Sequence, residues 1–553
     1  MVPGTEILKL PMSIIVTSQK DLLTRAMGRF YTHLLIGKQL TRDILAAISL
    51  EKRSNIRIID PFCGDGRLLC WLIEDLVASD IMSSSQSLYV ELWDIDETAL
   101  HKALNSVTCL GNKLNISLSI HHRLVNTFEI ALDYLGKFDI VITNPPWEVL
   151  KPDHRELKKL ETEEKQQYIG WLKRQDQILE ALYPLSQPQR KFSGWGTNLA
   201  RCGTEVALRL TSSQGVCGLV SPASLLADQL TEKLRQWILQ EYVIHNLAFY
   251  PAEARLFKGV DQSAITLIAS PGQTKKFNPV LTVYSRNHEV QSKSRFYISL
   301  DSLKKNNYIL PVHFGSAQIQ MFDSWADLPM FGDLEGKVKN GLWAGRELDE
   351  TGYQNYLCNK GHYLFLKGRM IQRFGIAEPP EMFVREDGPK IPKSADFHRI
   401  AWRDVSRPSQ KRRLQATLIP PQWVTGNSLH VTYFRDQDLN RLKALLALMN
   451  SFVFEFQLRA YLATSHVSLS SIRRVRLPDL TNRNLIETLS SLVDKCMEGC
   501  ETAETEIEIQ VAQAYGLSQR EFKLLLSAFE KLTVKEIGEL IPINDKNPQS
   551  LHA

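Results

Sequence analysis

The sequence predicts an α/β protein whose first half forms a doubly wound sheet and whose second half is built differently. Until about residue 275, segments with strand character alternate with segments whose apolar residues recur at helical spacing. An acidic, glycine-containing turn joins the first strand to the helix after it, as at the ligand-binding edge of such sheets. From about residue 310 the alternation stops, and 553 residues are more than one core usually holds.

Composition and charge narrow the class of protein only slightly. The formal net charge of +5 permits nucleic-acid binding without arguing for it. No apolar run reaches the ~18 residues of a membrane span, and the N-terminus lacks the pattern of a signal peptide. Of the eight cysteines only Cys496 and Cys500 lie close together, without a further pair or a histidine nearby. We therefore expect a cytoplasmic protein with reduced thiols, no metal site and no membrane contact.

The first elements lead into a candidate ligand loop. Residues 13–50 predict a helix that contains Gly28-Arg29-Phe30-Tyr31-Thr32. A strand over 56–59 runs into Asp60-Pro61-Phe62-Cys63-Gly64-Asp65-Gly66, and a helix follows over 68–78. Glycines let the backbone approach a ligand closely, and the start of a helix supplies N–H groups without partners inside the helix.

The next strands also end in polar residues. The strand over 88–96 ends in acids, and an acid at the end of a second strand suits bonding to a ribose diol. Asp96 is expected to cap the helix that begins at residue 97, because acids favour that position. A third strand is expected over 116–125, followed by Asn126-Thr127-Phe128.

The chain is organised around a hydrophobic strand over 138–143 that ends in Asn144-Pro145-Pro146-Trp147. Two consecutive prolines cannot continue a sheet ladder, so we expect a rigid loop at the carboxyl end of the strand. Ligands bind at that end in open α/β sheets. The loop offers a carboxamide, the carbonyl of Pro145 and an aromatic plane, which together suit a flat molecule that carries an amino group.

The remainder of the first half completes the alternation. Residues 148–202 are long and charged, and they predict either a solvated helical insertion or a lid or DNA-facing segment beside the pocket. A helix over 203–210, a strand over 215–222 and a helix over 223–240 follow. The strands 243–250 and 263–270 then form an antiparallel pair, with Phe257 between them.

These motifs resemble those of the amino-group methyltransferases that use S-adenosylmethionine, mainly DNA N6-adenine methyltransferases. The run from Asp60 to Gly66 is similar to their motif I, and Asn144-Pro145-Pro146-Trp147 is similar to their catalytic motif. Gly28 to Thr32 resembles motif X, with His33 where a proline is usual. Trp147 stands where tyrosine or phenylalanine is more common. The order of the motifs is that of the gamma class, in which cofactor and catalytic motifs precede the recognition domain.

The resemblance implies a domain organisation and a cofactor site. It predicts a Rossmann-like, seven-stranded methyltransferase domain over 1–305, an α+β target recognition domain over 306–480 and a helical region over 481–553. Asp60 would face the ammonium of S-adenosylmethionine, Asp94 would take the ribose hydroxyls, and Ile95 and Asn126 would contact the adenine. The implied cofactor-binding residues are Tyr31, Thr32, Asp60, Pro61, Phe62, Cys63, Gly64, Gly66, Asp94, Ile95, Asn126, Thr127 and Asn144.

The resemblance also assigns roles toward the substrate. The catalytic residues would be Asn144, Pro145, Pro146 and Trp147, of which Asn144 and Pro145 accept the N–H groups of the amine. Trp147 would stack on a base flipped out of the duplex, and Phe257 would pack against that base.

The second half carries basic residues interleaved with aromatics and amides, which suits a DNA surface. The candidates for DNA contacts are Arg403, Arg407, Lys411, Arg412 and Arg413 in one cluster, and Arg473 and Arg474 in a second. A helical stretch over 439–463 resembles the specificity regions of large N6-adenine methyltransferases. The helical tail over 483–540 is either a partner-binding or a packing element.

The resemblance implies a site-specific, adenine-specific DNA methyltransferase in a restriction–modification or phage-defence system. Its partners would be double-stranded DNA and a cognate restriction endonuclease or other defence-system subunits. One alternative is methylation of RNA or protein glutamine, and another is a catalytically idle DNA-binding subunit of a larger complex. A third is a fused nuclease, because residues 333–337 contain a Glu-x-Lys triplet.

Overall fold

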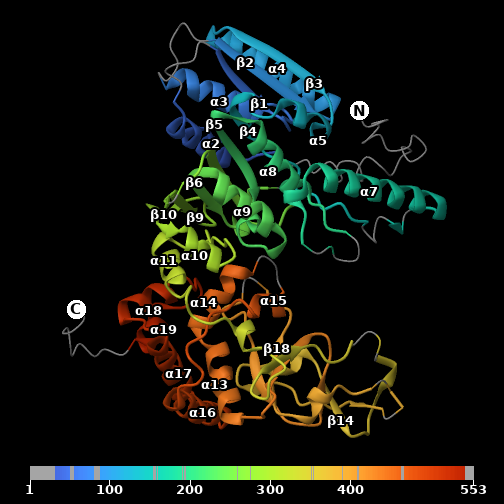
Figure 1. Ribbon diagram of the computed structural model, residues 1–553, viewed down its shortest axis with the longest axis vertical. Helices are drawn as coiled ribbons and strands as arrows, with labels where there is room; N and C mark the ends of the chain where they lie inside the picture. Colours follow the sequence, from blue (N-terminus) through green and yellow to red (C-terminus); the bar gives the residue numbers. More distant parts are fainter. Residues whose placement is uncertain are drawn as a thin grey trace. The chain divides into compact units, whose positions relative to one another are not determined.

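The computed structural model divides the chain into two compact units, Met1–Gln320 and Met321–Ala553, which are described separately (Figure 1). The division falls within helix α11, Ser316–Ser324. The structure describes residues 31–541 except 50–54, 80–86, 153–156, 159, 190, 192–194, 258, 275, 350–351, 353, 386, 389, 408–409 and 463–465. The helix expected over 13–50 therefore lies partly outside the described residues, and its described part is α2, Leu34–Ala47.

Nine strands of the described chain form one sheet in the first unit, in the order β10-β9-β6-β7-β5-β4-β1-β2-β3. They are β1 Asn55–Asp60, β2 Ser87–Asp94, β3 Leu118–Leu124, β4 Phe138–Thr143, β5 Thr211–Pro222, β6 Tyr242–Tyr250, β7 Ala264–Pro271, β9 Val280–Tyr284 and β10 Val290–Arg295. Strands β3, β2, β1, β4 and β5 run parallel, and β7 is antiparallel to both β5 and β6. The α/β fold class is confirmed.

The sheet is larger than predicted. All seven predicted strands are present, and β9 and β10 extend the edge beyond β6. Strand β9 pairs parallel to β6, and β10 returns antiparallel to it. The prediction missed these strands because it followed the alternation of strands and helices only to about residue 275. A separate two-stranded pair joins β8, Lys276–Phe277, to β11, Ile298–Ser299.

Helices cover both faces of this sheet (Figure 1). On one face α2, α3 (Arg67–Ala78) and α4 (Glu97–Leu114) pack on alternate apolar residues of the strands, such as Ile58 and Ile140. On the other face α8 (Leu199–Leu210) packs on β4 and β5, and α9 (Glu232–Glu241) packs on β6. The short helices α5 (Thr127–Ile130) and α10 (Leu300–Lys305) complete the unit. Asp96 caps α4, as predicted, by accepting hydrogen bonds from two backbone N–H groups.

Two of the predicted helices differ from the observed ones because short polar side chains bond to the local backbone. Where one helix was expected over 223–240, two 3-10 turns precede α9, and Asp228 accepts from the N–H of Leu230 at 2.9 Å. The helix expected over 439–463 is divided at Ser451, which ends α13 and caps α14. Its hydroxyl accepts from the N–H of Phe454 at 3.1 Å.

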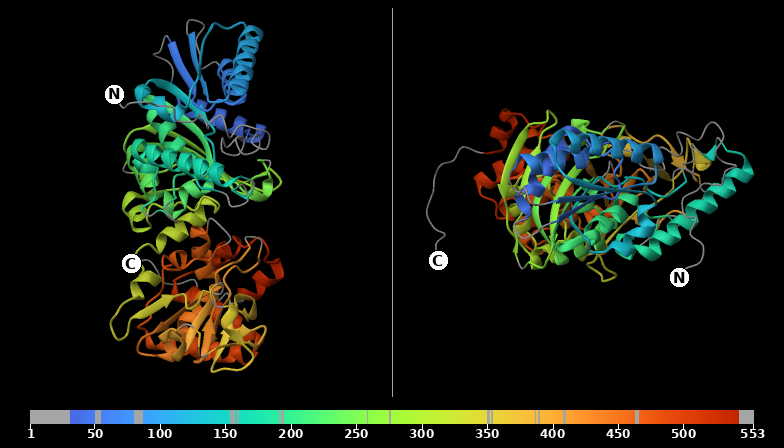
Figure 2. Two further views of the ribbon diagram at one scale, coloured as in Figure 1. Left: turned by 90° about the vertical axis from the view of Figure 1, so that its right-hand side faces the viewer. Right: turned by 90° about the horizontal axis from the view of Figure 1, so that it is seen from above.

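The inserted segment after Trp147 leaves and re-enters the domain at one point. Val149 pairs with Asn198 in an antiparallel bridge, and the Leu199 N–H donates to the Glu148 carbonyl at 2.8 Å. The insertion contains α7, Thr162–Leu182, which runs outward from the first unit (Figures 1 and 2). Helix α7 is not solvated all round, because one side buries aromatic and leucine side chains that include Trp171.

The second unit combines small sheets with a layer of helices. One sheet has the strand order β12-β21-β18-β19, a second has the order β13-β17-β14-β20, and β15 pairs with β16. Their bounds are β12 Leu342–Gly345, β13 Leu357–Cys358, β14 Tyr363–Leu366, β15 Ile371–Gln372, β16 Gly375–Ile376, β17 Phe383–Val384, β18 Arg399–Arg403, β19 Ala416–Ile419, β20 Trp423–Thr425 and β21 Leu429–Phe434. The helices are α13 Leu439–Asn450, α14 Phe452–Tyr461, α15 Leu469–Ile472, α16 Arg483–Met497, α17 Glu501–Ala514, α18 Gln519–Leu526 and α19 Val534–Leu540.

The C-terminal helices pack inside this unit. Helix α16 packs against α13 and α17. The hydroxyl of Tyr515, just after α17, donates to the carbonyl of Arg476 at 2.6 Å, and the indole of Trp325 donates to the carbonyl of Tyr515 at 3.3 Å. These contacts favour the packing interpretation of the tail. Among the described residues, none of the helices has the length and apolar character needed to cross a membrane.

Candidate active site

The carboxyl ends of the neighbouring strands β1 and β4 bring the two main predicted motifs together. Asp60 ends β1, and its side chain is 1% exposed. Its Oδ1 accepts a hydrogen bond from the Thr143 hydroxyl at 2.7 Å and one from the Phe62 N–H at 3.1 Å. Both hydrogen bonds that the described residues make to this carboxylate go to Oδ1. Thr143 immediately precedes Asn144, so the bond from its hydroxyl joins the acidic loop to the proline loop.

Burial raises the pKa of the Asp60 carboxyl to about 7, and the nearby Asp94 and Asp65 act in the same direction. The hydrogen bonds from Thr143 and Phe62 oppose this rise without cancelling it. A buried acid with further acids around it has a high affinity for a cation, because a positive charge relieves both the burial cost and the repulsion. The site therefore suits a positively charged ligand.

The loop after Asp60 is shaped by two glycines with left-handed backbone, Gly64 at φ 53° and Gly66 at φ 79°. The Gly64 N–H donates to Asp94 Oδ2 at 2.8 Å, and the Asp96 N–H donates to Asp94 Oδ1 at 2.8 Å. Asp94 thus lies beside the loop, as predicted, and its carboxylate is oriented by these two backbone bonds. A Cβ on Gly66 would lie 2.9 Å from the backbone of Ala103, so the glycine also lets α3 begin close to α4.

Asn126 and Thr127 make contacts close to the loop after Asp60. The Asn126 carboxamide caps α5: its oxygen accepts from the Phe128 N–H, and its nitrogen donates to Glu129 at 2.7 Å. The hydroxyl of Thr127, 3% exposed, donates to the carbonyl of Pro61. Asn126 thus shapes the start of α5, and Thr127 supports the loop after Asp60 through Pro61.

The first residue of the proline loop is oriented by the N-terminal segment. Asn144 Nδ2 donates to the Thr32 hydroxyl at 3.2 Å, which turns the carboxamide oxygen the other way. Thr32 is 3% exposed, and its carbonyl accepts from Arg67 at 3.2 Å. The Arg67 guanidinium lies over the Tyr31 ring, 4.7 Å from the ring centre. Tyr31 and Thr32 are thus brought to the loops that carry Gly64 and Asn144, as the motifs predict.

Pro145 packs against Gly203, a residue that the sequence analysis did not predict to belong to the site. Gly203 lies in α8, and a Cβ built there would fall 2.3 Å from Pro145 Cβ and 3.4 Å from the Phe62 ring. Any larger side chain at 203 would displace the proline loop. The signal in the sequence is a glycine inside a strongly helical segment, where it costs ~1 kcal/mol relative to alanine.

The two predicted aromatic residues lie together. The rings of Trp147 and Phe257 have centres 4.7 Å apart and are tilted by 53°. Both side chains are mostly buried, at 7% and 5% exposure, and they belong to the same core as α2 and α3. Their contact joins the proline loop to the connection between β6 and β7.

Part of the chain that carries this site matches a known protein family. Residues 85–257 match the Eco57I restriction-modification methylase family. The matched part, which we call the methylase region, contains the Asn144-Pro145-Pro146-Trp147 loop and Phe257, and the predicted resemblance to restriction–modification methyltransferases is confirmed. Among curated proteins, no match to the sequence was found.

Three solved structures illustrate the fold. The type IIL restriction-modification enzyme MmeI, in complex with DNA, is 12% identical and similar over 95% of this chain and 77% of its own, with a TM-score of 0.53. The type IIG restriction endonuclease BpuSI is 14% identical over 92% and 68%, with a TM-score of 0.42. A putative class I S-adenosylmethionine-dependent methyltransferase from Listeria monocytogenes is 18% identical over 48% and 64%, with a TM-score of 0.29. The likeness to MmeI, at 12% identity, shows the fold alone, and it extends well beyond the methylase region.

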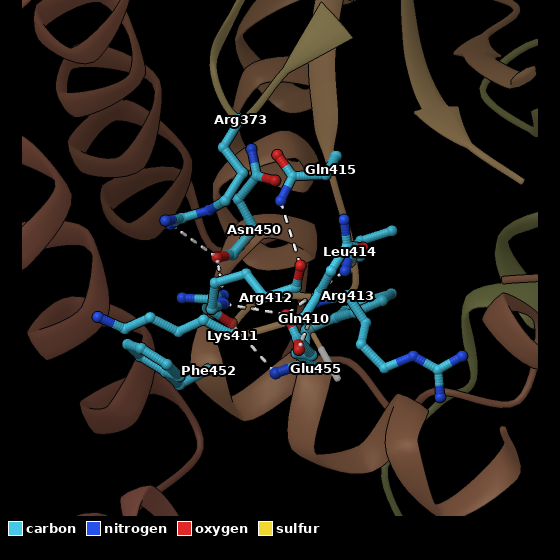
Figure 3. A network of polar contacts seen from close by, with 12 residues as sticks. Arg373, Gln410, Lys411, Arg412, Arg413, Leu414, Gln415, Asn450, Phe452 and Glu455 are labelled. Carbon is cyan, nitrogen blue, oxygen red and sulfur yellow. Dashed lines mark hydrogen bonds and ion pairs between the residues drawn. The ribbon is translucent and has the colours of Figure 1, made fainter. Parts of the chain in front are cut away.

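The basic residues predicted to contact DNA lie outside the methylase region, and two of them are buried. Arg412 is 8% exposed and Arg413 is 6% exposed. The Arg412 guanidinium bonds to Glu455 at 2.9 Å and lies over the Phe452 ring (Figure 3). It also bonds to Glu508 at 3.2 Å. The expected DNA contact does not suit these two buried side chains, because Arg412 pairs with acids of α14 and α17 and the Arg413 guanidinium donates to the Ser406 carbonyl. The sequence could not reveal this, since Glu508 is 96 residues away.

The other basic candidates have different environments. Arg403 donates to the backbone carbonyls of Arg369 and Ile371, and Lys411 pairs with Glu536. Arg473 forms two bonds to Glu335, at 2.6 and 2.9 Å. Arg474 lies over the Tyr461 ring, 6.0 Å from its centre, and Arg407 is exposed. Of the predicted set, Arg407 is thus the clearest surface cation.

Proposed function

We propose that the protein transfers a methyl group from S-adenosylmethionine to the N6 amino group of a flipped adenine in DNA. The proposal rests on the hydrogen bond that connects the Asp60 carboxylate to Thr143, the residue before Asn144. Thr143 donates to Asp60 and directly precedes Asn144, whose carboxamide is held by Thr32. A cation-binding acid and an amine-binding amide are therefore fixed side by side at adjacent strand ends, which is the arrangement that methyl transfer from a sulfonium to an amine requires.

The residues of this site fit the cofactor. S-adenosylmethionine supplies, when bound, a methyl group on a positively charged sulfur that leaves as a neutral thioether. Asp60, buried and with its pKa raised, suits the ammonium of the methionine part. The left-handed Gly64 and Gly66 let the backbone pass beneath the ligand, and Asp94 suits the ribose hydroxyls. The family matched by residues 85–257 and the fold both agree with this use.

The proline loop performs the other half of the reaction. The exocyclic amine of adenine is a poor nucleophile, because its lone pair is delocalised into the ring. The Asn144 Oδ1 and the Pro145 carbonyl each accept one N–H, which draws the nitrogen toward tetrahedral geometry and stabilises the positive charge that develops there. The nitrogen forms its new bond to the methyl carbon as the carbon–sulfur bond breaks. The extra proton then leaves to solvent, so a strong general base is not required.

The charge distribution of the second unit supports DNA as the substrate. Residues 337–435, which carry its small sheets, contain 17 Lys and Arg against 9 Asp and Glu. Residues 483–541, which form the C-terminal helices, contain 6 against 11. Positive charge is thus concentrated on the sheet part, as phosphate contacts require. The similar fold solved in complex with DNA, that of MmeI, agrees with this assignment. We assign target recognition to the second unit.

The alternatives have less support. Glu335 of the Glu-x-Lys triplet lies just after the 3-10 turn Phe331–Leu334, and its carboxylate is held by Arg473. A nuclease centre needs such an acid for a metal ion, so the triplet does not suit this role. An idle DNA-binding subunit would not need the joined acid and amide loops. Methylation of protein glutamine would not explain a basic second unit of this size, whereas RNA carries the same phosphate charge as DNA and is distinguished by the assay below.

A methyl-transfer assay tests the proposed function. Purified protein is incubated with tritiated-methyl S-adenosylmethionine and, separately, with double-stranded DNA, RNA and a protein mixture. We expect label to enter the DNA alone. Label in RNA or protein supports the first alternative, and tight cofactor binding without transfer to any of them would support the idle subunit.

Trp147→Ala should weaken capture of the flipped base. Stacking on an aromatic ring contributes ~1–3 kcal/mol per base, so the KM for DNA should rise by about one to two orders of magnitude. Fluorescence of 2-aminopurine at the target position measures the flipped state, and it should fall in the alanine variant. Trp147→Phe keeps a stacking face and serves as the matched control. Equal fluorescence in wild type and Trp147→Ala would count against the role.

Cofactor affinity should depend on pH through Asp60. The folded carboxyl has a pKa raised to about 7, and a bound ammonium favours its charged form. Above this pH the carboxylate is already charged, whereas below it binding must first remove a proton. The Kd for S-adenosylmethionine, measured by calorimetry between pH 5.5 and 7.5, should therefore rise as pH falls, approaching about tenfold per pH unit. Asp60→Asn should bind more weakly and lose this dependence; a wild-type Kd that stays constant would contradict the assignment.

A further inference from the structure

A second polar cluster, in the second unit, is not used by the proposed chemistry. It surrounds the carboxylate of Asp404, which directly follows β18. Oδ1 of Asp404 contacts His430 Nε2 at 2.9 Å and Arg346 at 3.1 Å, and Oδ2 contacts His466 Nδ1 at 3.0 Å. We call these four residues the Asp404 cluster. They come from four segments that are separated in sequence, so the fold itself assembles the cluster.

The centre of the Asp404 cluster is rigid. The N–H of Asp404 donates to the Ser428 carbonyl at 3.0 Å, and its own carbonyl accepts from the Val467 N–H at 2.6 Å. The His430 ring stacks on the Trp402 indole, with centres 5.4 Å apart and planes 22° apart. Burial alone would raise the pKa of Asp404, but the hydrogen bonds from His430 and His466, together with the nearby Arg346, lower it to about 2. The acid is thus charged at all physiological pH values.

The outer members of the cluster are accessible. The side chains of Arg346 and His466 are 48% and 58% exposed, whereas that of Asp404 is 8% exposed. Val405, next to the acid, is 54% exposed. A buried carboxylate therefore holds an arginine in a defined direction at the surface. Because the arginine is already held in one direction, it loses less side-chain entropy when it binds. A contact that must discriminate between bases needs such a fixed direction.

We propose that Arg346, supported by Asp404, reads the edge of a guanine in duplex DNA; this rests on the proposed function for its substrate. The planar guanidinium fork matches the two acceptors, O6 and N7, that guanine presents in the major groove. A phosphate is the weaker match. The Arg346–Asp404 pair carries no net charge, and the buried carboxylate repels an anion, whereas a neutral base edge meets no such repulsion. The basic sheet part of the unit attracts the DNA, and the Asp404 cluster reads it.

The test compares the sequences that wild type and variants modify. Wild type, Arg346→Ala and Arg346→Lys are incubated with plasmid and genomic DNA and S-adenosylmethionine, and modified bases are located by single-molecule sequencing. We expect wild type to modify a motif that contains a guanine, and both variants to accept other bases at that one position. Discrimination there should fall by about tenfold to a hundredfold. Arg385→Ala is the matched control, because Arg385 is an exposed arginine of the same unit that pairs with the exposed Asp387.

The outcomes separate this inference from the function on which it rests. If wild type modifies no DNA, the proposed function fails and the inference with it. If wild type modifies a motif and the Arg346 variants keep it unchanged, the inference alone is overturned. An unchanged motif with uniformly lower affinity and a shallower salt dependence would identify Arg346 as a phosphate contact, which also overturns it. Circular dichroism of the variants confirms that these exposed substitutions leave the fold intact.

Discussion

Asn144→Ala should abolish methyl transfer while S-adenosylmethionine still binds. The substitution deletes the Oδ1 acceptor for the adenine amine but leaves Asp60, Gly64 and Asp94 in place. Removing one preorganised polar group that stabilises charge in a transition state typically lowers kcat ~10²–10³-fold. We expect a loss at least this large, with the Kd for the cofactor changed by less than about threefold, since the groups proposed to hold the cofactor, Asp60, Gly64 and Asp94, are unchanged.

Two further variants sharpen this prediction. Thr32→Val removes only the hydroxyl that orients the Asn144 carboxamide, so its loss of kcat should be smaller than that of Asn144→Ala. Asn105→Ala changes an exposed asparagine of α4 and should behave as wild type. The quantities to measure are single-turnover methylation rates and calorimetric Kd values for all three proteins. Near-wild-type turnover in Asn144→Ala would refute the assigned role.

Arg412→Met should cause the largest loss of stability in the second unit. Arg412 lies between the carboxylates of Glu455 and Glu508, and Glu455 also accepts from Arg459 and from the Arg413 N–H (Figure 3). Removing one partner of a buried pair leaves an uncompensated charge and typically costs ~3–5 kcal/mol. The segment 410–416 and the helices α14 and α17 should separate more easily as a result.

Amide hydrogen exchange in the full-length protein measures this effect locally. Peptides from α13 and α14 should exchange much faster in Arg412→Met than in wild type, whereas peptides from β1 and β4 should be unchanged. The control is Arg385→Met, because Arg385 and Asp387 form an exposed pair whose loss should cost less than ~1 kcal/mol. Equal protection of α14 in the two variants would show that the buried network contributes little.

The candidate site could be predicted to the extent that it is local in sequence. The strand over 138–143, the turn from Asp60 to Gly66 and the cap at Asp96 are each encoded by neighbouring residues, and the structure has them where they were expected. That the loops after Asp60 and Thr143 lie at neighbouring strand ends followed from a general rule about such sheets, not from the residues between them. The rule could place the two loops, but not the hydroxyls of Thr143 and Thr32 that join them.

Contacts between distant segments could not be predicted in the same way. Nothing near Arg412 in the sequence indicates that Glu508 neutralises it, and nothing near Gly203 indicates that Pro145 rests on it. The same holds for Arg346, which becomes conspicuous only because Asp404 supports it. Basic residues therefore look the same in the sequence. Only the structure shows which of them are buried against an acidic side chain and which face solvent. The extra strands β9 and β10 were missed because they follow β7 with no helix between them, so the alternation of strands and helices does not reveal them.

The central claim is that the loop after Asp60 and the Asn144-Pro145-Pro146-Trp147 loop together methylate an amino group of adenine in DNA. Its most direct test is mass spectrometry of nucleosides from DNA that has been incubated with the protein and S-adenosylmethionine bearing a deuterated methyl group. The claim predicts labelled N6-methyldeoxyadenosine from wild type and none from Asn144→Ala. Labelled 5-methyldeoxycytidine, or no labelled nucleoside from a protein that binds both cofactor and DNA, would contradict it.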